Sequence, residues 1–174
     1  MAFSLDQIED GSGKSGALVY AAESACGDWL AQRGFTAFLA LSGSIGSVEK
    51  KMIHLLRGTE FVEALGRGRV IGERAVATQR LLFPRVGVEV DGRLLPWTSL
   101  PEGWISATFV AAEYSAAGEP LHNVADDERL LTRKRISSAI EKEFLPGQTK
   151  VKEFPMIEQL IAPFLRPIGY IERG

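Results

Sequence analysis

The sequence predicts a mainly α-helical fold, a small bundle of about four helices with one or two β-hairpins. Two observations lead to this fold class. Several segments repeat apolar residues at the spacing of an amphipathic helix. One segment alternates valines and then reaches an Asp-Gly pair, which is typical of a tight hairpin. The order of these segments is not that of an α/β enzyme scaffold.

The N-terminal part of the chain predicts a flexible arm followed by a helix. Residues 1–16 end in a run of glycine and serine, and such a composition buries too little apolar surface to offset the entropy of ordering. Residues 17–34 have apolar residues at helical spacing, and Gly34 is placed to end this helix. Residues 35–46 are apolar but finish in a Gly/Ser cluster, so we expect irregular structure or a short strand.

Three further helices are predicted along the chain. Residues 47–66 give the clearest pattern, with one apolar stripe made of Val48, Met52, Leu55, Leu56, Thr59 and Val62. Residues 101–117 predict a second helix, which begins at a proline that suits a first turn. Residues 155–166 predict the last helix, and Pro163 is expected either to kink it or to limit it to about two turns, because proline has no backbone N–H to donate.

Two hairpins are predicted between these helices. Residues 81–97 alternate valines on one side of Asp91-Gly92, and a type I′ turn needs positive φ at both central positions. Residues 128–147 include a mostly polar stretch with weak alternation, which predicts an exposed hairpin arm. We expect a helical domain over residues 17–166 that carries this arm, and a tail over residues 167–174.

The composition excludes several classes of protein. The chain has 174 residues, 45% hydrophobic and 24% charged, as in an ordinary soluble globular domain. Its formal net charge of −2 gives no overall field that recruits nucleic acid or an anionic membrane. The single cysteine, Cys26, excludes an internal disulfide. There is no stretch of about 18 apolar residues, so we expect an intracellular protein without a membrane span.

The segment EDGSGKSG, residues 9–16, is the strongest apparent catalytic motif. Its Gly13-Lys14-Ser15 resembles the end of a phosphate-binding loop, G-x-x-x-x-G-K-[ST]. The first glycine of that loop would stand where this chain has Ile8, and the preceding residues do not form the continuous apolar strand that the motif requires. An NTPase is therefore the least supported of the functions that the sequence suggests.

The remaining polar clusters do not meet the requirements of catalysis or metal binding. His54 lies beside the apolar stripe of residues 47–66, and its neighbours four residues away, Lys50 and Gly58, do not supply the partner that a general base needs, so it is expected at the surface or its boundary. His122 precedes the acidic run 126–128, which lacks the glycine and spacing of a calcium loop. Cys26 has no basic neighbour and is expected in the core. We expect no enzyme activity, no cofactor and no metal site.

Two basic clusters are candidate binding surfaces, and the sequence does not determine what they contact. The first consists of Arg67, Arg69 and Arg74, and the second of Arg133, Lys134 and Arg135. Basic residues of this kind are compatible with contacts to a nucleic-acid backbone, with a protein interface, or with plain solvation.

A colinear set of short motifs resembles a family of tailed-bacteriophage proteins labelled DnaT-like single-stranded DNA-binding proteins. The set comprises Tyr20 before ESACGDWL, the helix EKKMIHLLRGTEFVEAL, Gln79, the core Phe83-Pro84-Arg85-Val86-Gly87-Val88, the turn Asp91-Gly92, Leu100-Pro101, and EQLIAPFLR. The order and spacing extend from about residue 17 to residue 166. Phe83 stands where the family usually has tryptophan, and GDW replaces the usual acidic-aromatic pair. Residues 128–147 have no close counterpart.

The resemblance implies a structural head–tail connector, an adaptor protein of the phage neck. Members of this family lie among the head–tail connector genes, which implies a dodecameric ring between the portal protein and the next neck or tail-completion protein. Double-stranded DNA would pass through the lumen without sequence readout. The protein would be made in the host cytoplasm and reside in the virion, with no membrane partner.

The residues expected to form an interface or to maintain the fold all belong to these motifs and basic clusters. They are Tyr20, Trp29, Phe83, Pro84, Arg85, Gly87, Asp91, Gly92, Trp97, Arg133, Lys134 and Arg135.

The alternative hypothesis is a single-stranded DNA-binding accessory protein of replication, as the family label states. Such a protein needs exposed aromatic side chains beside basic residues. The large candidates are Trp29, Trp97 and Trp104, which the pattern predicts to be buried or to flank the hairpin.

Overall fold

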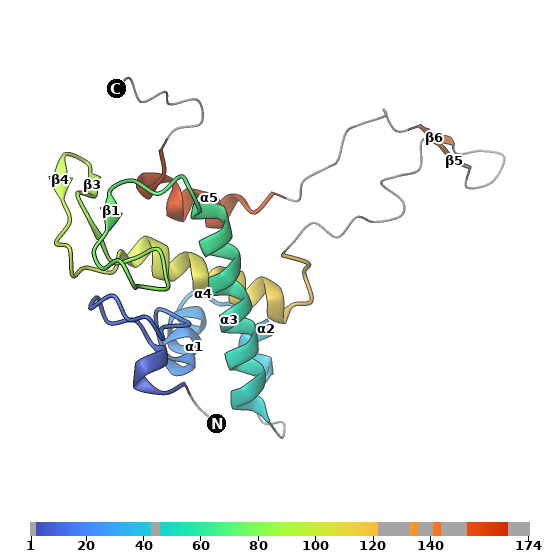
Figure 1. Cartoon of the computed structure of the whole chain (residues 1–174). Coiled ribbons are helices and arrows are strands. Elements are labelled where there is room, and N and C mark those ends of the chain that lie inside the picture. Colours follow the sequence, from blue (N-terminus) through green and yellow to red (C-terminus); the bar gives the residue numbers. More distant parts are fainter. Residues whose placement is uncertain (1–2, 43–45, 122–132, 136–140, 144–152, 167–174) are drawn as a thin grey trace.

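The computed structural model describes residues 3–42, 46–121, 133–135, 141–143 and 153–166 (Figure 1). Its helices are η1 (Leu5–Gln7), α1 (Glu23–Ala31), α2 (Ala37–Ala40), α3 (Ser47–Gly66), α4 (Glu102–Ala116), α5 (Pro155–Ile161) and η3 (Ala162–Phe164). Its strands are β1 (Glu73–Arg74), β2 (Arg85–Val86), β3 (Glu89–Val90), β4 (Arg93–Leu94), β5 (Arg133–Arg135) and β6 (Glu141–Glu143). The strands pair antiparallel as β1–β2, β3–β4 and β5–β6. The predicted mainly α fold with small hairpins is confirmed.

Helix α4 lies at the centre of the fold because nearly every residue along it is apolar or small. It packs on α3 along one side and on α5 along another (Figure 1). At the crossing with α3, Gly58 lies directly against the α4 backbone, since an added Cβ would be 2.6 Å from the amide nitrogen of Ala112. The absence of a side chain at Gly58 therefore sets how closely the two main helices approach.

Two clusters of buried side chains divide the core. The larger cluster joins α5, the end of α3 and the loops around β2, with Phe83, Trp104 and Phe164 in mutual ring contact at centroid separations of 5.0–6.3 Å. The smaller cluster joins α1, α2 and the other end of α4, and it contains Cys26, as the sequence predicts. Burial raises the pKa of the Cys26 thiol far above its usual range, which keeps it protonated.

Residues 35–46 differ from the sequence-based prediction. The segment contains a four-residue helix, α2, in place of irregular structure or a strand. The buried carboxylate of Glu113 on α4 accepts hydrogen bonds from the backbone N–H groups of Thr36, Ala37 and Phe38 at 2.8–3.1 Å. A distant glutamate thus supplies the N-terminal cap that this short helix lacks locally.

The N-terminal segment is packed against the body, which differs from the flexible arm expected for residues 1–16. Ile8 pairs with Val19 in a parallel bridge, and Glu9 is only 2% exposed. The Glu9 carboxylate accepts the backbone N–H groups of Gly11, Gly13 and Lys14 at 2.8–2.9 Å. These hydrogen bonds to a buried carboxylate offset the entropy cost of ordering the segment, and the composition alone did not predict them.

The same contacts explain the motif that resembles a phosphate-binding loop. Its backbone amides do converge on an anion, but that anion is the side chain of Glu9. The Lys14 ammonium donates to the carbonyls of Leu5 and Ile8 and forms an ion pair with Asp10 at 2.8 Å. The groups that would hold a phosphate are therefore occupied within the loop.

The described residues contain paired strands within both predicted hairpins. Asp91 and Gly92 have φ values of 52° and 75°, so the expected type I′ geometry joins β3 to β4. Strands β5 and β6 pair Arg133 with Glu143 and Arg135 with Glu141 within the predicted arm 128–147. The rest of that arm and the tail 167–174 lie outside the described residues.

Candidate nucleic-acid interface

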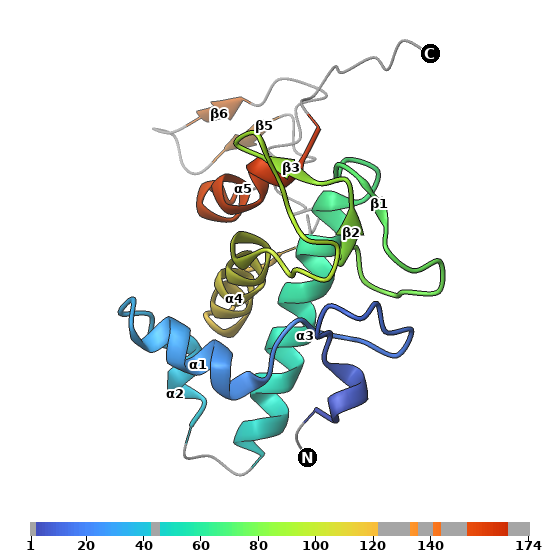
Figure 2. The same ribbon diagram turned by 90° about the vertical axis from the view of Figure 1, so that its left-hand side faces the viewer.

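One side of the molecule carries strands β1 to β4 and a group of arginines in and around these strands. We call this surface the hairpin face and define it as residues 67–98 together with Arg166; Figure 2 shows it toward the viewer. Residues 67–93 carry six arginines against three carboxylates, in a chain whose net charge is −2. Charge is therefore distributed unevenly, and the hairpin face is basic although the protein is slightly acidic.

A buried hydrogen-bond network beneath the hairpin face fixes its shape. The Tyr20 hydroxyl donates to the Glu63 carboxylate at 2.6 Å and accepts the backbone N–H of Phe83 at 3.1 Å. Glu63 also accepts the backbone N–H of Leu82 at 2.7 Å and the indole N–H of Trp104 at 3.3 Å. Burial raises the pKa of Glu63, and it raises that of Tyr20 together with the nearby Glu63 charge.

The motif around Phe83 and Pro84 is held by Gln79, whose side chain is 2% exposed. The Gln79 amide donates to the carbonyls of Leu81 and Pro84, each at 2.9 Å. The peptide bond between Phe83 and Pro84 is cis. Tyr20, Phe83 and Pro84 therefore act in the scaffold of the hairpin face rather than on its surface.

Arg85 has a structural position. Its guanidinium donates to the carbonyls of Ile71 at 2.7 Å and of Gly72, and it closes the loop that precedes β1. Burial lowers the pKa of Arg85, and the like charges of Arg74 and Arg166 lower it further. Arg74 and Arg166 thus each lie near enough for their charge to act on the Arg85 guanidinium.

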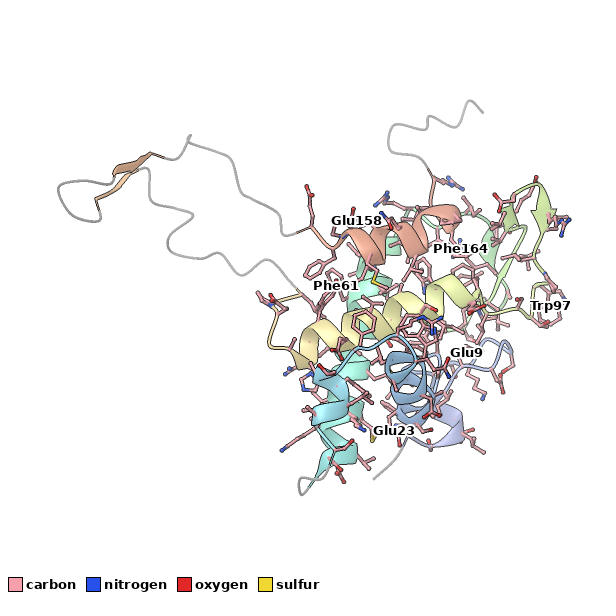
Figure 3. All side chains as sticks on the ribbon, turned by 180° about the vertical axis from the view of Figure 1, so that it is seen from behind. Glu9, Glu23, Phe61, Trp97, Glu158 and Phe164 are labelled. Atoms are coloured by element: carbon pink, nitrogen blue, oxygen red, sulfur yellow. The ribbon has the colours of Figure 1, made fainter. Side chains whose placement is uncertain are left out.

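The most exposed large apolar residues of the hairpin face lie at β4 and just after it. Leu94 is 71% exposed and Trp97 is 55% exposed, and Arg93 is exposed beside them. Figure 3 shows Trp97 at the edge of the molecule below the strands. A large aromatic ring that the fold leaves in solvent next to arginine side chains is the combination that single-stranded nucleic-acid sites use.

The other two tryptophans do not join this surface. Trp104 is fully buried in the larger core cluster. Trp29 is half-buried on α1, where it stacks on Phe35 at 6.4 Å and has the Arg33 guanidinium 3.8 Å above its ring. Of the three candidates, the structure therefore exposes the one that flanks the hairpin.

The remaining predicted residues fall into two groups. Gly87, Asp91 and Gly92 are exposed in the turns of the hairpin face, where positive φ is required. Arg133, Lys134 and Arg135 form β5, and only their backbone is described.

Sequence analysis missed the residues on which the scaffold depends most. Glu9, Glu63 and Glu113 are carboxylates in or near the core, and each accepts three hydrogen bonds. Their signal in the sequence is weak, because each occupies a position that also suits an exposed charge.

The described residues carry few signs of other kinds of site. Among them, no helix is long and apolar enough to cross a membrane, and no three His, Cys, Asp or Glu side chains group as metal ligands would. His54 contacts the Ser115 hydroxyl at 2.9 Å through Nδ1. His122 and the acidic run 126–128 lie outside the described ranges.

Comparison with known proteins gives one match. A family model described as "Putative DnaT-like ssDNA binding protein" matches residues 7–173, which is nearly the whole chain. No curated protein and no solved structure matches the chain.

The match corrects the function expected from the sequence. The expectation of a phage head–tail connector, with a dodecameric ring, a portal partner and passage of double-stranded DNA, is wrong, because the description that matches names single-stranded DNA binding and no finding supports a connector. The resemblance to the DnaT-like family itself is confirmed over these residues.

Proposed function

We propose that the chain, which belongs to the family of DnaT-like single-stranded DNA-binding proteins, binds single-stranded DNA through its hairpin face. The observation that carries this proposal is the exposed ring of Trp97 on the basic hairpin face, in the segment that follows the exposed Arg93. The family match covers the whole of this face. The structural argument and the family description thus point to the same ligand.

Trp97 supplies a stacking surface for an unpaired base. Stacking on an aromatic side chain is worth about 1–3 kcal/mol per base and tolerates every sequence, since every base has a π face. Leu94 extends the apolar surface, and its 71% exposure leaves it free to contact a base or a sugar. Bases in a duplex are already stacked on one another, so this surface favours single strands.

The arginines supply contacts to phosphate. Arg67 and Arg74 are exposed on the hairpin face, with one Arg74 N–H donated to the Gln79 carbonyl at 3.4 Å, whereas the guanidinium of Arg85 is taken up by several backbone carbonyls. Each phosphate neutralised releases condensed counterions, so affinity falls with salt at a log–log slope of about −0.7 per contact on a single strand. Arg85 instead stabilises the loop that precedes β1, between Arg69 and Arg74.

The variant Trp97→Ala tests the proposal. With a fluorescein-labelled (dT)30 oligonucleotide, fluorescence anisotropy at 50 mM NaCl is expected to show binding by the wild type. We expect the variant to bind about tenfold more weakly, since it loses one stacking interaction. Trp97→Phe keeps an aromatic ring and is expected to retain most of the affinity.

The matched control is Arg57→Ala, which removes an exposed arginine from α3 near Ser115 and Gly118 instead of the hairpin face. This control is expected to bind as the wild type does, whereas Arg93→Ala weakens binding and lowers the salt slope. A wild type that shows no binding at 50 mM NaCl, or that binds a duplex of equal length as tightly, contradicts the proposal.

A further inference from the structure

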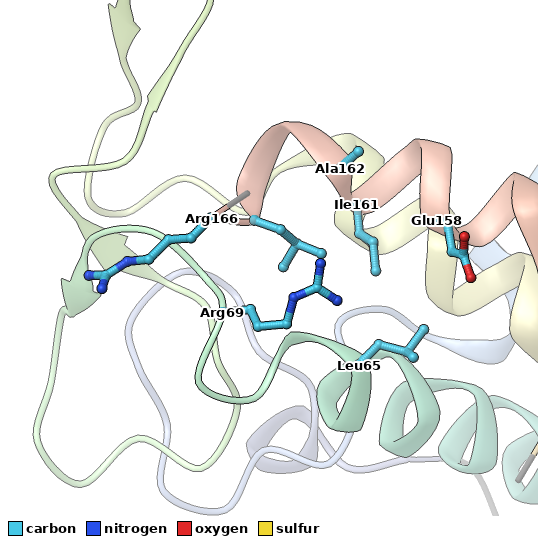
Figure 4. A pocket seen from close by; sticks show the side chains of 7 residues that line it. Leu65, Arg69, Glu158, Ile161, Ala162 and Arg166 are labelled. Carbon is cyan, nitrogen blue, oxygen red and sulfur yellow. The ribbon is translucent and has the colours of Figure 1, made fainter. Parts of the chain in front are cut away.

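A pocket of about 410 Å³ opens next to the hairpin face, between the end of α3 and the α5–η3 segment. Figure 4 shows its lining, with the Arg69 guanidinium on one side and Glu158 projecting from α5 on the other. Its volume is within the range of small-molecule sites, which begins at about 300 Å³. The backbone holds the walls in place, because the Arg166 N–H donates to the Arg69 carbonyl at 2.7 Å.

The walls of the pocket are apolar and its two ends carry opposite charges. Leu65 comes from α3, and Ile161, Ala162 and Leu165 come from the C-terminal segment. Within the described part of the chain, no ion pair joins Arg69 to Glu158, although both line the same pocket. A ligand that fills the space between them must present apolar surface to the walls, acceptors to Arg69 and donors to Glu158.

We propose that this pocket is a base-binding subsite that prefers guanine, at the end of the single-stranded DNA path. The O6 and N7 atoms of guanine accept from an arginine in a bidentate pair, and its N1 and N2 groups donate to a carboxylate. Guanine thus offers Arg69 and Glu158 two hydrogen bonds each. Thymine carries no exocyclic amine and offers Glu158 a single donor.

The position of Arg166 connects the pocket to the hairpin face. Figure 4 shows its side chain directed from the rim of the pocket toward the strands. Its backbone N–H donates to the Arg69 carbonyl at 2.7 Å, which holds it beside the first residues of the hairpin face. A phosphate attached to the nucleotide in the pocket would be neutralised there, and the chain could continue toward Trp97. The inference therefore rests on the proposed function and adds a base preference to it.

Mononucleotides test the subsite directly. In ¹⁵N-edited NMR titrations of the full chain, 5′-dGMP is expected to shift the amide signals of residues 65–69 and 158–166, and to bind about tenfold more tightly than 5′-TMP. The two ligands carry the same phosphate, so the difference reports the base. We expect Glu158→Gln to remove most of the preference and Arg69→Gln to weaken binding of both nucleotides.

The controls are Arg57→Gln and Glu153→Gln, which remove exposed charges that do not line the pocket. Both controls are expected to keep the preference for 5′-dGMP. Equal affinities for the two nucleotides overturn the guanine preference, and an absence of shifts in the pocket overturns the subsite. If (dT)30 still binds in either case, the failure belongs to the subsite alone and the proposed function stands.

Discussion

Gly58→Ala is expected to destabilise the protein by about 3 kcal/mol, although alanine is the better helix former. A Cβ at Gly58 would lie 2.6 Å from the backbone nitrogen of Ala112 and 2.6 Å from the carbonyl oxygen of Thr108. Both are backbone atoms of α4 and cannot rotate away as a side chain would. The two central helices must separate to admit the methyl group, and the packing on both sides of α4 is lost with that movement.

Urea unfolding followed by circular dichroism measures this effect, with Gly27→Ala as the matched control. Gly27 is also buried inside a helix, but a Cβ there would meet only the Leu39 side chain at an ordinary 3.7 Å. We expect the control to keep or raise the stability by up to about 1 kcal/mol, because only the propensity difference remains. The packing argument fails if both variants change stability in the same direction.

Local sequence patterns were sufficient wherever a structure is determined by neighbouring residues. The predicted helix 47–66 coincides with α3, and Asp91-Gly92 forms the expected turn. Pro163 follows a seven-residue α5 and lies in the 3₁₀ turn that ends it, as its missing N–H predicts. In each case the determining residues are adjacent in the chain.

Structures that depend on distant partners were not predictable in this way. Helix α2 depends on Glu113, whose hydrogen-bond partners are 75 to 77 residues away in the chain. The order of the N-terminal segment depends on a carboxylate that turns inward, and Glu9 in the sequence is indistinguishable from a solvated acid. Short sequence patterns therefore predict neither the hydrogen bonds of Glu113 to residues 36–38 nor the burial of Glu9.

The candidate site was predictable in its parts but not in its arrangement. Arg67, Arg69 and Arg74 already formed a basic cluster in the sequence, and Trp97 already flanked the hairpin. The sequence did not indicate that Arg166 joins these arginines from a segment more than 90 residues later in the chain, nor that Trp97 faces solvent. Exposure and convergence are properties of the folded chain, and they distinguish a binding surface from a solvated one.

Glu63→Ala is expected to cost about 3 kcal/mol or more, because it leaves three buried donors without an acceptor. These donors are the Tyr20 hydroxyl, the Leu82 backbone N–H and the indole N–H of Trp104. They come from three separate parts of the chain, so the loss loosens the scaffold under the hairpin face. Glu60→Gln removes an exposed carboxylate from the same helix and is expected to change the unfolding free energy by less than about 0.5 kcal/mol.

The milder variant Glu63→Gln gives a pH-dependent result whose sign follows from burial. Burial raises the pKa of Glu63 above its ordinary value of 4.5, so the folded state binds this proton more tightly than the unfolded state does. The resulting stabilisation is complete below pH 4.5 and is lost as the pH rises through the folded pKa. Glutamine does not titrate, so the stability of the wild type relative to Glu63→Gln should fall as the pH rises from 4.5 through the folded pKa. Urea unfolding of both proteins across this range measures the difference and cancels the titrations that they share. A difference that stays constant with pH, or that grows as the pH rises, would show that the hydrogen bonds from Tyr20 and Leu82 outweigh burial at this carboxylate.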